Sequence, residues 1–182
     1  MQFEPTAIDG AVLVQPKVFG DERGFFKESW NERTFREAGY DWKFVQDNHS
    51  RSSQGILRGL HFQTEQAQGK LVRVTSGEVY DVVVDLRKSS PSFGQWIGVL
   101  LSAEAHNMLY MPPGCAHGFY VTSESADFLY KTTDYYHPQS ELTLAWDDPT
   151  VGIEWPVIAG GEPQLSEKDA QGLAWGEVPY YP

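Results

Sequence analysis

The sequence predicts an all-β fold, because short β-prone stretches follow one another along the chain and helix signals are rare. These stretches are rich in β-branched and aromatic residues and are separated by Gly, Pro, Asn, Asp and Ser. Many short strands with regular turn signals are typical of an antiparallel sandwich or barrel. We expect the jelly-roll form of this class, with a few short helices at its periphery.

The predicted strands are the stretches in which Val, Ile, Leu, Thr and aromatic residues concentrate. In chain order they cover residues 11–14, 71–75, 79–86, 96–101, 107–111, 118–122, 126–132 and 141–146. The stretch 79–86, Val-Tyr-Asp-Val-Val-Val-Asp-Leu, is strongly β-branched. Because only Ser76-Gly77-Glu78 separate it from 71–75, we expect these two strands to form a hairpin.

Two helices are predicted from their end signals. The first covers about residues 32–38, where Asn31 is a suitable N-cap and Gly39 a suitable C-terminal stop. The second is a short turn after Ser166, because Ser166-Glu167-Lys168-Asp169 resembles a capping box in which Asp replaces the usual Glu or Gln.

Length and charge restrict the class of protein. A chain of 182 residues, 41% of them hydrophobic, can bury one core, and no Gly/Ser-rich or Pro-rich linker divides it. We therefore expect a single domain over residues 1–182. The 14 basic and 25 acidic residues give a formal charge of −11, which argues against nucleic acid as a partner. A small phosphorylated ligand is compatible with this charge, because a few clustered arginines can hold a diphosphate.

Cysteine content and hydropathy predict a cytoplasmic location. The single cysteine, Cys115, cannot form an intrachain disulfide, and residues 1–10 lack the basic and apolar regions of a signal peptide. No apolar run approaches the roughly 20 residues that cross a bilayer, so no membrane partner is expected.

Three short segments indicate acid–base chemistry beside a carbonyl group. They are 56–63, 68–73 and 128–131, and they contain His61, Lys70 and Tyr130. A histidine can remove the proton next to a carbonyl, a lysine can hold the resulting enolate oxygen, and a tyrosine can return a proton from another direction. These are the requirements of an epimerisation.

Metal binding is the alternative that the histidines raise. Residues 112–119, Pro-Pro-Gly-Cys-Ala-His-Gly-Phe, resemble the second motif of cupins, a Pro-x-Gly-x-x-His turn that places His117 at a barrel mouth. In metal-binding cupins this histidine joins a His-x-His pair and a glutamate. Here His61 is followed by Phe62-Gln63, so the pair is incomplete. We expect no metal and no other cofactor.

The chain resembles the dTDP-4-dehydrorhamnose 3,5-epimerase family from about residue 16 to residue 171. The matching segments, in order, are 18–26, 44–50, 57–63, 68–73, 93–96, 112–119 and 152–156. The resemblance implies a double-stranded β-helix of the cupin class, a homodimer, and no cofactor. It also implies a substrate, a dTDP-4-keto-6-deoxyhexose of rhamnose synthesis, whose carbons 3 and 5 are inverted.

The resemblance assigns four catalytic roles. His61 is the base, Asp169 orients it, Lys70 binds the keto oxygen, and Tyr130 is the acid. Each residue also has a purely structural interpretation. Without the family, His61 in its strand-like run reads as a hydrogen-bonded core histidine, Asp169 as a helix cap, Lys70 as a solvated side chain and Tyr130 as a core aromatic. The cap and the catalytic role of Asp169 can coexist.

The resemblance implies a larger set of substrate-binding residues, several of which are expected to reach the site of a neighbouring subunit. Tyr135 and Tyr136 are the candidates for stacking on the thymine. The remaining matching positions are Arg23, Glu28, Gln46, Asn48, Arg58, His117, Glu141 and Lys168. Surface ion pairing is the alternative interpretation of the charged members.

Two rival functions stay open at this point. One is a single-position epimerase or a ketoisomerase of the same fold, acting on a related dTDP-4-keto sugar. The other is a non-catalytic cupin that binds a small ligand. The sequence leaves open the order in which the two carbons invert.

Overall fold

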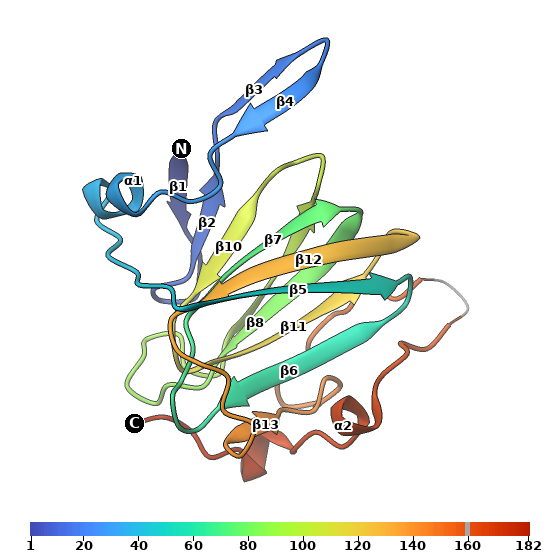
Figure 1. Ribbon diagram of the computed structural model, residues 1–182. Helices are drawn as coiled ribbons and strands as arrows, with labels where there is room; N and C mark the ends of the chain where they lie inside the picture. The colour runs from blue at the N-terminus through green and yellow to red at the C-terminus, as the bar shows by residue number, and fades with distance from the viewer. Residues whose placement is uncertain (159–160) are drawn as a thin grey trace.

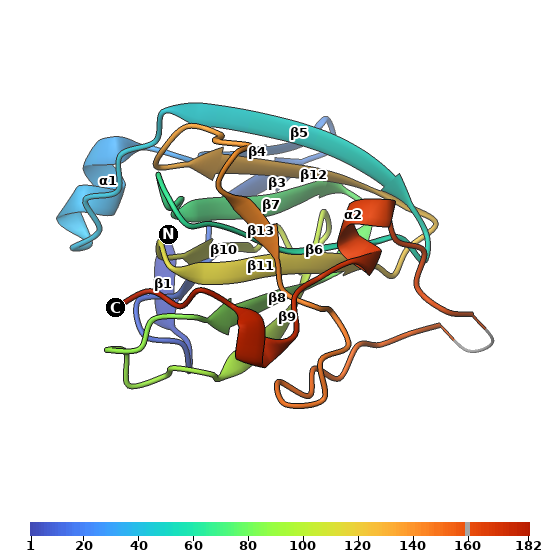
Figure 2. The same ribbon diagram turned by 90° about the horizontal axis from the view of Figure 1, so that it is seen from below.

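The computed structural model describes residues 1–158 and 161–182 and contains two antiparallel sheets that face each other (Figures 1 and 2). The larger sheet has the order β1 (Gln2–Pro5), β2 (Val12–Gln15), β10 (Met108–Met111), β7 (Lys70–Ser76), β12 (Ser125–Thr132) and β5 (Gln46–Ser53). The smaller has the order β13 (Glu141–Thr143), β6 (Leu57–Gln63), β11 (Cys115–Val121), β8 (Glu78–Asp85) and β9 (Trp96–Ser102). This arrangement confirms the predicted all-β jelly roll.

The predicted hairpin of residues 71–75 and 79–86 is wrong. The first stretch is β7 of the six-stranded sheet, whereas the second is β8 of the five-stranded sheet. The connection at Gly77 therefore carries the chain from one sheet to the other. A short turn between two apolar strands has the same sequence signal whether the strands pair in one sheet or belong to two facing sheets, because each strand packs on the shared core. A Cβ at Gly77 would lie 1.9 Å from the Ser125 carbonyl oxygen, so only glycine fits there.

The main core lies between the two sheets. Its buried members come from both, for example Val72 and Phe128 of the larger sheet and Val83 and Phe119 of the smaller. A second cluster covers the outer face of the smaller sheet with residues of the C-terminal segment, including Trp155 and Trp175. Because β8 and β11 contribute to both clusters, alternate residues of these strands point into the barrel. The inward-pointing residues can therefore line an interior site.

Both predicted helices are present. Asn31 caps α1 (Glu32–Glu37) by accepting hydrogen bonds from the backbone N–H groups of Arg33 and Thr34. This helix buries Phe35 in an aromatic cluster on the outer face of the six-stranded sheet. Ser166 caps α2 (Glu167–Ala170). A short 3₁₀ helix, η1 (Trp175–Glu177), was not predicted.

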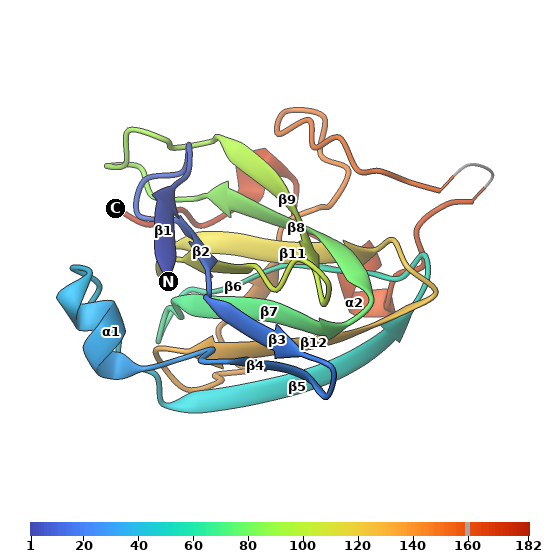
Figure 3. The ribbon, with the colours of Figure 1, turned by 90° about the horizontal axis from the view of Figure 1, so that it is seen from above.

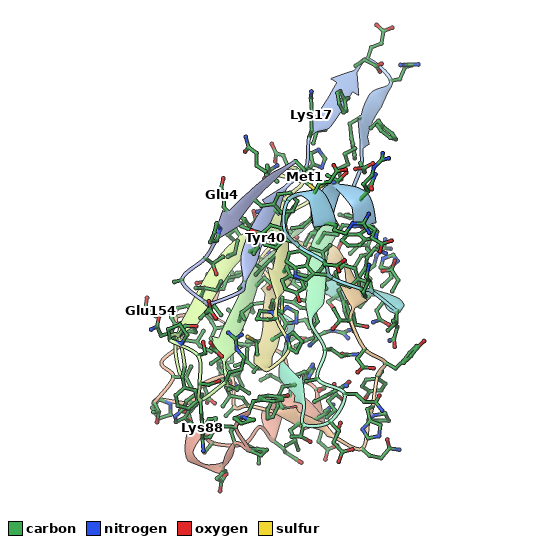
Figure 4. The ribbon with its side chains drawn as sticks, turned by 90° about the vertical axis from the view of Figure 1, so that its left-hand side faces the viewer. Met1, Glu4, Lys17, Tyr40, Lys88 and Glu154 are labelled. Carbon is green, nitrogen blue, oxygen red and sulfur yellow. The ribbon has the colours of Figure 1, made fainter. Side chains whose placement is uncertain are left out.

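A hairpin made of β3 (Val18–Asp21) and β4 (Gly24–Lys27) projects away from the barrel (Figures 1 and 4). Lys17, labelled in Figure 4, precedes the hairpin, and Figure 3 shows the hairpin in blue from above. Phe19, Phe25 and Phe26 on this hairpin are 54%, 61% and 71% exposed. Large aromatic side chains at such exposure mark a surface that favours a partner.

No helix in the described ranges is both long enough and apolar enough to cross a membrane.

Candidate active site

A cavity of about 360 Å³ opens into the barrel between the two sheets. This volume is within the range of small-molecule sites. Its walls come from β5, β7 and β12 of the larger sheet and from β6, β11 and β13 of the smaller sheet. Lys168 of α2 also lines the cavity, and Figure 2 shows α2 beside β6. The lining residues are Gln46, Asn48, Ser50, Arg58, His61, Gln68, Lys70, His117, Gly118, Phe119, Phe128, Tyr130, Tyr136, Glu141 and Lys168.

Two facing glycines let β6 and β11 approach closely at the cavity wall. A Cβ at Gly59, which has φ +112°, would lie 2.5 Å from the Gly118 Cα. A Cβ at Gly118 would lie 2.6 Å from the Arg58 carbonyl oxygen. Real Cβ atoms do not come this close, so the contact requires glycine on both strands. It brings His61 and His117 into register across the two strands.

His61 forms a pair with Asp169. Its Nε2 lies 2.5 Å from Asp169 Oδ1, and Asp169 is only 4% exposed. Burial is the largest single influence on the pKa of Asp169 and raises it, but the interactions with His61, with Ser166 and with the Gly59 backbone together outweigh burial, so the net shift is downward. The carboxylate fixes the ring orientation and leaves Nδ1 as the nitrogen available to a ligand.

The predicted cap at Ser166 is present, but only half of the capping box forms, because the Asp169 carboxylate contacts the Ser166 hydroxyl and not its backbone N–H. Ser166 Oγ accepts a hydrogen bond from the Asp169 backbone N–H at 3.1 Å and donates to Asp169 Oδ2 at 2.8 Å. The Ser166 hydroxyl therefore holds the same carboxylate that contacts His61.

A second histidine–aspartate pair lies deeper in the barrel. His117 Nε2 is 2.9 Å from Asp81 Oδ2, and Asp81 is fully buried. Burial lowers the pKa of His117, while Asp81 acts in the opposite direction. His117 therefore contributes a neutral imidazole to the cavity wall near neutral pH.

Lys70 begins β7 and points its ammonium group into the cavity lining. Burial lowers its pKa from 10.5 to about 8, although Glu141 and Asp81 partly offset the effect by attraction. A lysine in this range still carries its charge at neutral pH, and in a poorly solvated site that charge strongly stabilises a developing oxyanion.

Tyr130 reaches the cavity from β12, in the sheet opposite to that of His61. Burial raises its pKa above the ordinary value, with a further contribution from Glu141. The phenol therefore stays protonated at neutral pH and can donate a proton.

Glu141 joins two predicted binding residues in the cavity lining. It accepts hydrogen bonds from the Tyr136 hydroxyl, at 2.8 Å, and from the Lys168 ammonium. Burial opposes the charge of Glu141, but these two donors lower its pKa overall. Elsewhere in the cavity lining, the Gln46 amide donates to Asn48 Oδ1 at 2.9 Å and Arg58 Nε donates to Ser52 Oγ at 3.0 Å.

Three predicted binding residues do not line this cavity. Arg23 lies at the turn of the projecting hairpin, where it pairs with Asp21 and is exposed. Glu28 accepts hydrogen bonds from Asn31 and Thr34 at the start of α1. Tyr135 is 60% exposed and, unlike Tyr136, is absent from the cavity wall.

Sequence reasoning missed several residues of the site. Asp81 had a signal, because it is a charged residue inside an apolar β-branched run. Ser50 and Gln68 lie in the family-like segments 44–50 and 68–73, but neither residue was singled out there. Phe119 and Phe128 stack at 4.2 Å and form an apolar part of the wall.

Within residues 1–158 and 161–182, no group of three or more His, Cys, Asp or Glu side chains is arranged to hold a metal ion.

The fold and this cavity define a cupin jelly roll with a polar site for a small ligand. Residues 5–177 match the family described as dTDP-4-dehydrorhamnose 3,5-epimerase. The chain is 56% identical over 177 residues to the dTDP-4-dehydrorhamnose 3,5-epimerase of Pseudomonas aeruginosa, and the match covers 97% of each chain. The chain therefore belongs to the dTDP-4-dehydrorhamnose 3,5-epimerase family and is an epimerase.

Solved structures agree with this assignment. The dTDP-6-deoxy-D-glucose-3,5-epimerase of Legionella pneumophila, in complex with dTDP-4-keto-L-rhamnose, is 51% identical with a TM-score of 0.93. That match covers 97% of this chain and 94% of the other. A 3'-monoepimerase from Streptomyces bikiniensis, in complex with dTDP-quinovose, is 34% identical with a TM-score of 0.87, covering 94% of this chain and 86% of the other.

Proposed function

We propose that this chain inverts carbons 3 and 5 of dTDP-4-dehydro-6-deoxy-D-glucose and so forms dTDP-4-dehydro-L-rhamnose. Both carbons flank the 4-keto group, so their protons become acidic when the ketone oxygen is stabilised. One site can therefore serve both centres. The observation that carries the proposal is the placement of His61 and Tyr130 on facing sheets of one cavity, with Lys70 on β7, the strand next to that of Tyr130.

The proposed sequence of proton transfers uses four residues. His61 Nδ1 removes the proton from one of the two carbons, while Asp169 holds the ring and stabilises the imidazolium. The electron pair moves onto the keto oxygen, where Lys70 balances the enolate charge. Tyr130 then donates its proton to the opposite face of the carbon. The protonated His61 and the deprotonated Tyr130 are reset by proton exchange with solvent before the step repeats at the other carbon.

The nucleotide is held by the polar and charged residues around the reacting centre. Arg58 and Lys168 supply positive charge for the diphosphate, and an arginine fork can bind two phosphate oxygens at once. Tyr136 is the better candidate for the thymine, because it belongs to the cavity wall whereas Tyr135 does not.

We also propose a homodimer in which the β3–β4 hairpin reaches the partner's cavity. Three exposed phenylalanines on the projecting hairpin (Figure 4) support this, and so does the position of Arg23 in the turn between β3 and β4. An apolar hairpin with a charged tip fits an interface that covers the phenyl rings and delivers the guanidinium to a diphosphate. The dimer works in the cytoplasm, without a metal or cofactor.

The main rival is a single-position epimerase, because a 3'-monoepimerase shares the fold at 34% identity. Deuterium labelling separates the two. The protein is incubated with dTDP-4-keto-6-deoxyglucose in heavy water and the label is located by NMR. Deuterium at carbons 3 and 5 with inverted product supports the proposal. Label at one carbon indicates the single-position activity, and no label at either indicates a non-catalytic binding protein.

A further inference from the structure

Gln63 is a buried polar side chain that the proposed reaction does not use. It stands on β6 two residues after His61, at the position where a His-x-His pair would have its second histidine. Its exposed fraction is 4%, and it does not line the cavity of about 360 Å³. A buried amide is costly unless its polar atoms are hydrogen-bonded, so the partners of Gln63 show what it does.

The Gln63 amide holds the main chain on both sides of Tyr136. Its Nε2 donates to the carbonyl oxygens of Tyr135, at 3.2 Å, and of Gln66, at 2.9 Å. Its Oε1 accepts a hydrogen bond from the His137 N–H at 3.1 Å. The Tyr135 carbonyl and the His137 N–H belong to the peptide groups directly before and after the Tyr136 Cα. One side chain therefore fixes both peptide groups that flank this tyrosine.

Tyr136 has two further anchors. Its backbone N–H donates to Gln46 Oε1 at 3.1 Å, and its hydroxyl donates to Glu141 Oε2 at 2.8 Å. Gln46 lies on β5 of the larger sheet, whereas Gln63 lies on β6 of the smaller one. The main chain at Tyr136 is thus held from both sheets, and its ring lines the cavity while remaining 52% exposed.

We propose that Gln63 is a positioning residue that fixes Tyr136 for the nucleoside part of the ligand before the ligand binds. The segment 133–140 between β12 and β13 contains no helix or strand, so side-chain anchors decide its arrangement. A segment that is already ordered does not pay its ordering cost on binding, which raises affinity. The identity of the ligand rests on the proposed function, but the effect on the main chain does not.

The first test measures amide hydrogen exchange by NMR in the ligand-free wild type and in Gln63→Met. The Tyr136 N–H is the informative group, because its own acceptor, Gln46, is unchanged. We expect faster exchange at Tyr136 and His137 in the variant and unchanged exchange at Val83 of β8. Equal protection of Tyr136 in both proteins would overturn the inference, whatever reaction the protein catalyses.

The second test measures dTDP affinity by calorimetry in the wild type, Gln63→Met, Tyr136→Ala and the double variant. We expect Gln63→Met to weaken dTDP binding about tenfold, because the apparent Kd rises as the binding-competent fraction falls. Added to Tyr136→Ala, it should weaken binding no further, since it acts through that ring. Unchanged affinity in Gln63→Met, or fully additive effects, would overturn the inference. Gln63→Asn, with an amide one methylene shorter, is the second variant and should weaken binding in the same direction.

Asn107→Leu is the matched control. The Asn107 amide also donates to one backbone carbonyl, that of Leu100 at 2.8 Å, and accepts from one backbone N–H, that of Ser102 at 3.2 Å, but it does not line the cavity. This variant should bind dTDP as the wild type does, and an equal loss of affinity would overturn the inference. A wild type that does not bind dTDP would instead overturn the proposed function.

Discussion

His61 and Tyr130 lie on opposite walls of one cavity, His61 on β6 of the five-stranded sheet and Tyr130 on β12 of the six-stranded sheet. Inversion at a carbon requires that one group remove a proton from one face and a different group deliver a proton to the other. Two facing sheets supply such an arrangement without any conformational change. The jelly roll thus provides the geometry, and the buried environment adjusts the proton affinities of the groups that it holds.

Replacing His61 with alanine should abolish deuterium uptake at both carbons, because one base serves both. We expect a loss of roughly 10²- to 10⁴-fold in kcat. Asp169→Asn should be milder, since the imidazole remains and loses only its orienting charge. Single-turnover NMR in heavy water measures both variants. Near wild-type exchange in His61→Ala would remove this residue from the proposed mechanism.

Activity should fall above about pH 8, where Lys70 loses its proton. The folded protein releases this proton near pH 8, whereas the unfolded chain releases it near 10.5. Between these values the unfolded state binds more protons, so this group makes stability rise with pH. The loss of activity is therefore not caused by unfolding through Lys70. The test is a kcat–pH profile, with melting curves recorded at the same pH values. Activity that stays constant up to pH 10 would contradict the predicted role of the Lys70 charge.

Turnover should survive exhaustive treatment with EDTA. The expectation comes from the ligand set, since Phe62-Gln63 replace the second histidine of a His-x-His pair. Activity is measured before and after chelation, with metal content determined on the same sample. Loss of turnover that one particular divalent metal restores would show that this prediction is wrong.

The role of Arg23 in the partner's site can be tested with mixed dimers. An Arg23→Ala chain and a His61→Ala chain are given different tags, co-expressed, and the mixed dimer is purified. If Arg23 acts in the partner's cavity, one of the two sites has both residues, so the mixed dimer should show about half the wild-type activity. If Arg23 acts within its own chain, neither site is complete, and the activity should not exceed that of the Arg23→Ala dimer.

The fold was predictable where side chains alternate between a core and a surface. The strands around Val83 and Phe128 were found for that reason, and Asn31 and Ser166 marked both helices. β5, Gln46–Ser53, was missed because both of its faces are polar: one is turned to the cavity and the other to solvent. A strand that lines a polar site loses the apolar alternation by which strands are recognised.

The site was predictable to the extent that its residues fall in family-like segments. His61 and Lys70 do, Tyr130 falls in the segment 128–131 that indicated acid–base chemistry, and all three line the cavity. Asp81 lies outside the family-like segments. Its contact with His117 joins positions 36 residues apart, which a local sequence pattern does not reveal. The assignment of β7 and β8 to different sheets was equally inaccessible, because a local pattern does not specify which sheet a strand joins.

The most direct test of the proposed mechanism is the Tyr130→Phe variant in heavy water. It keeps the ring and its packing and removes only the hydroxyl, so His61 and Lys70 should still form the enolate. We measure the ratio of deuterium incorporation to inverted product by NMR, in the variant and in the wild type. The account predicts a higher ratio in the variant, with label incorporated at retained configuration or with one centre inverted. An unchanged ratio, with both centres inverted at the wild-type rate, would contradict it.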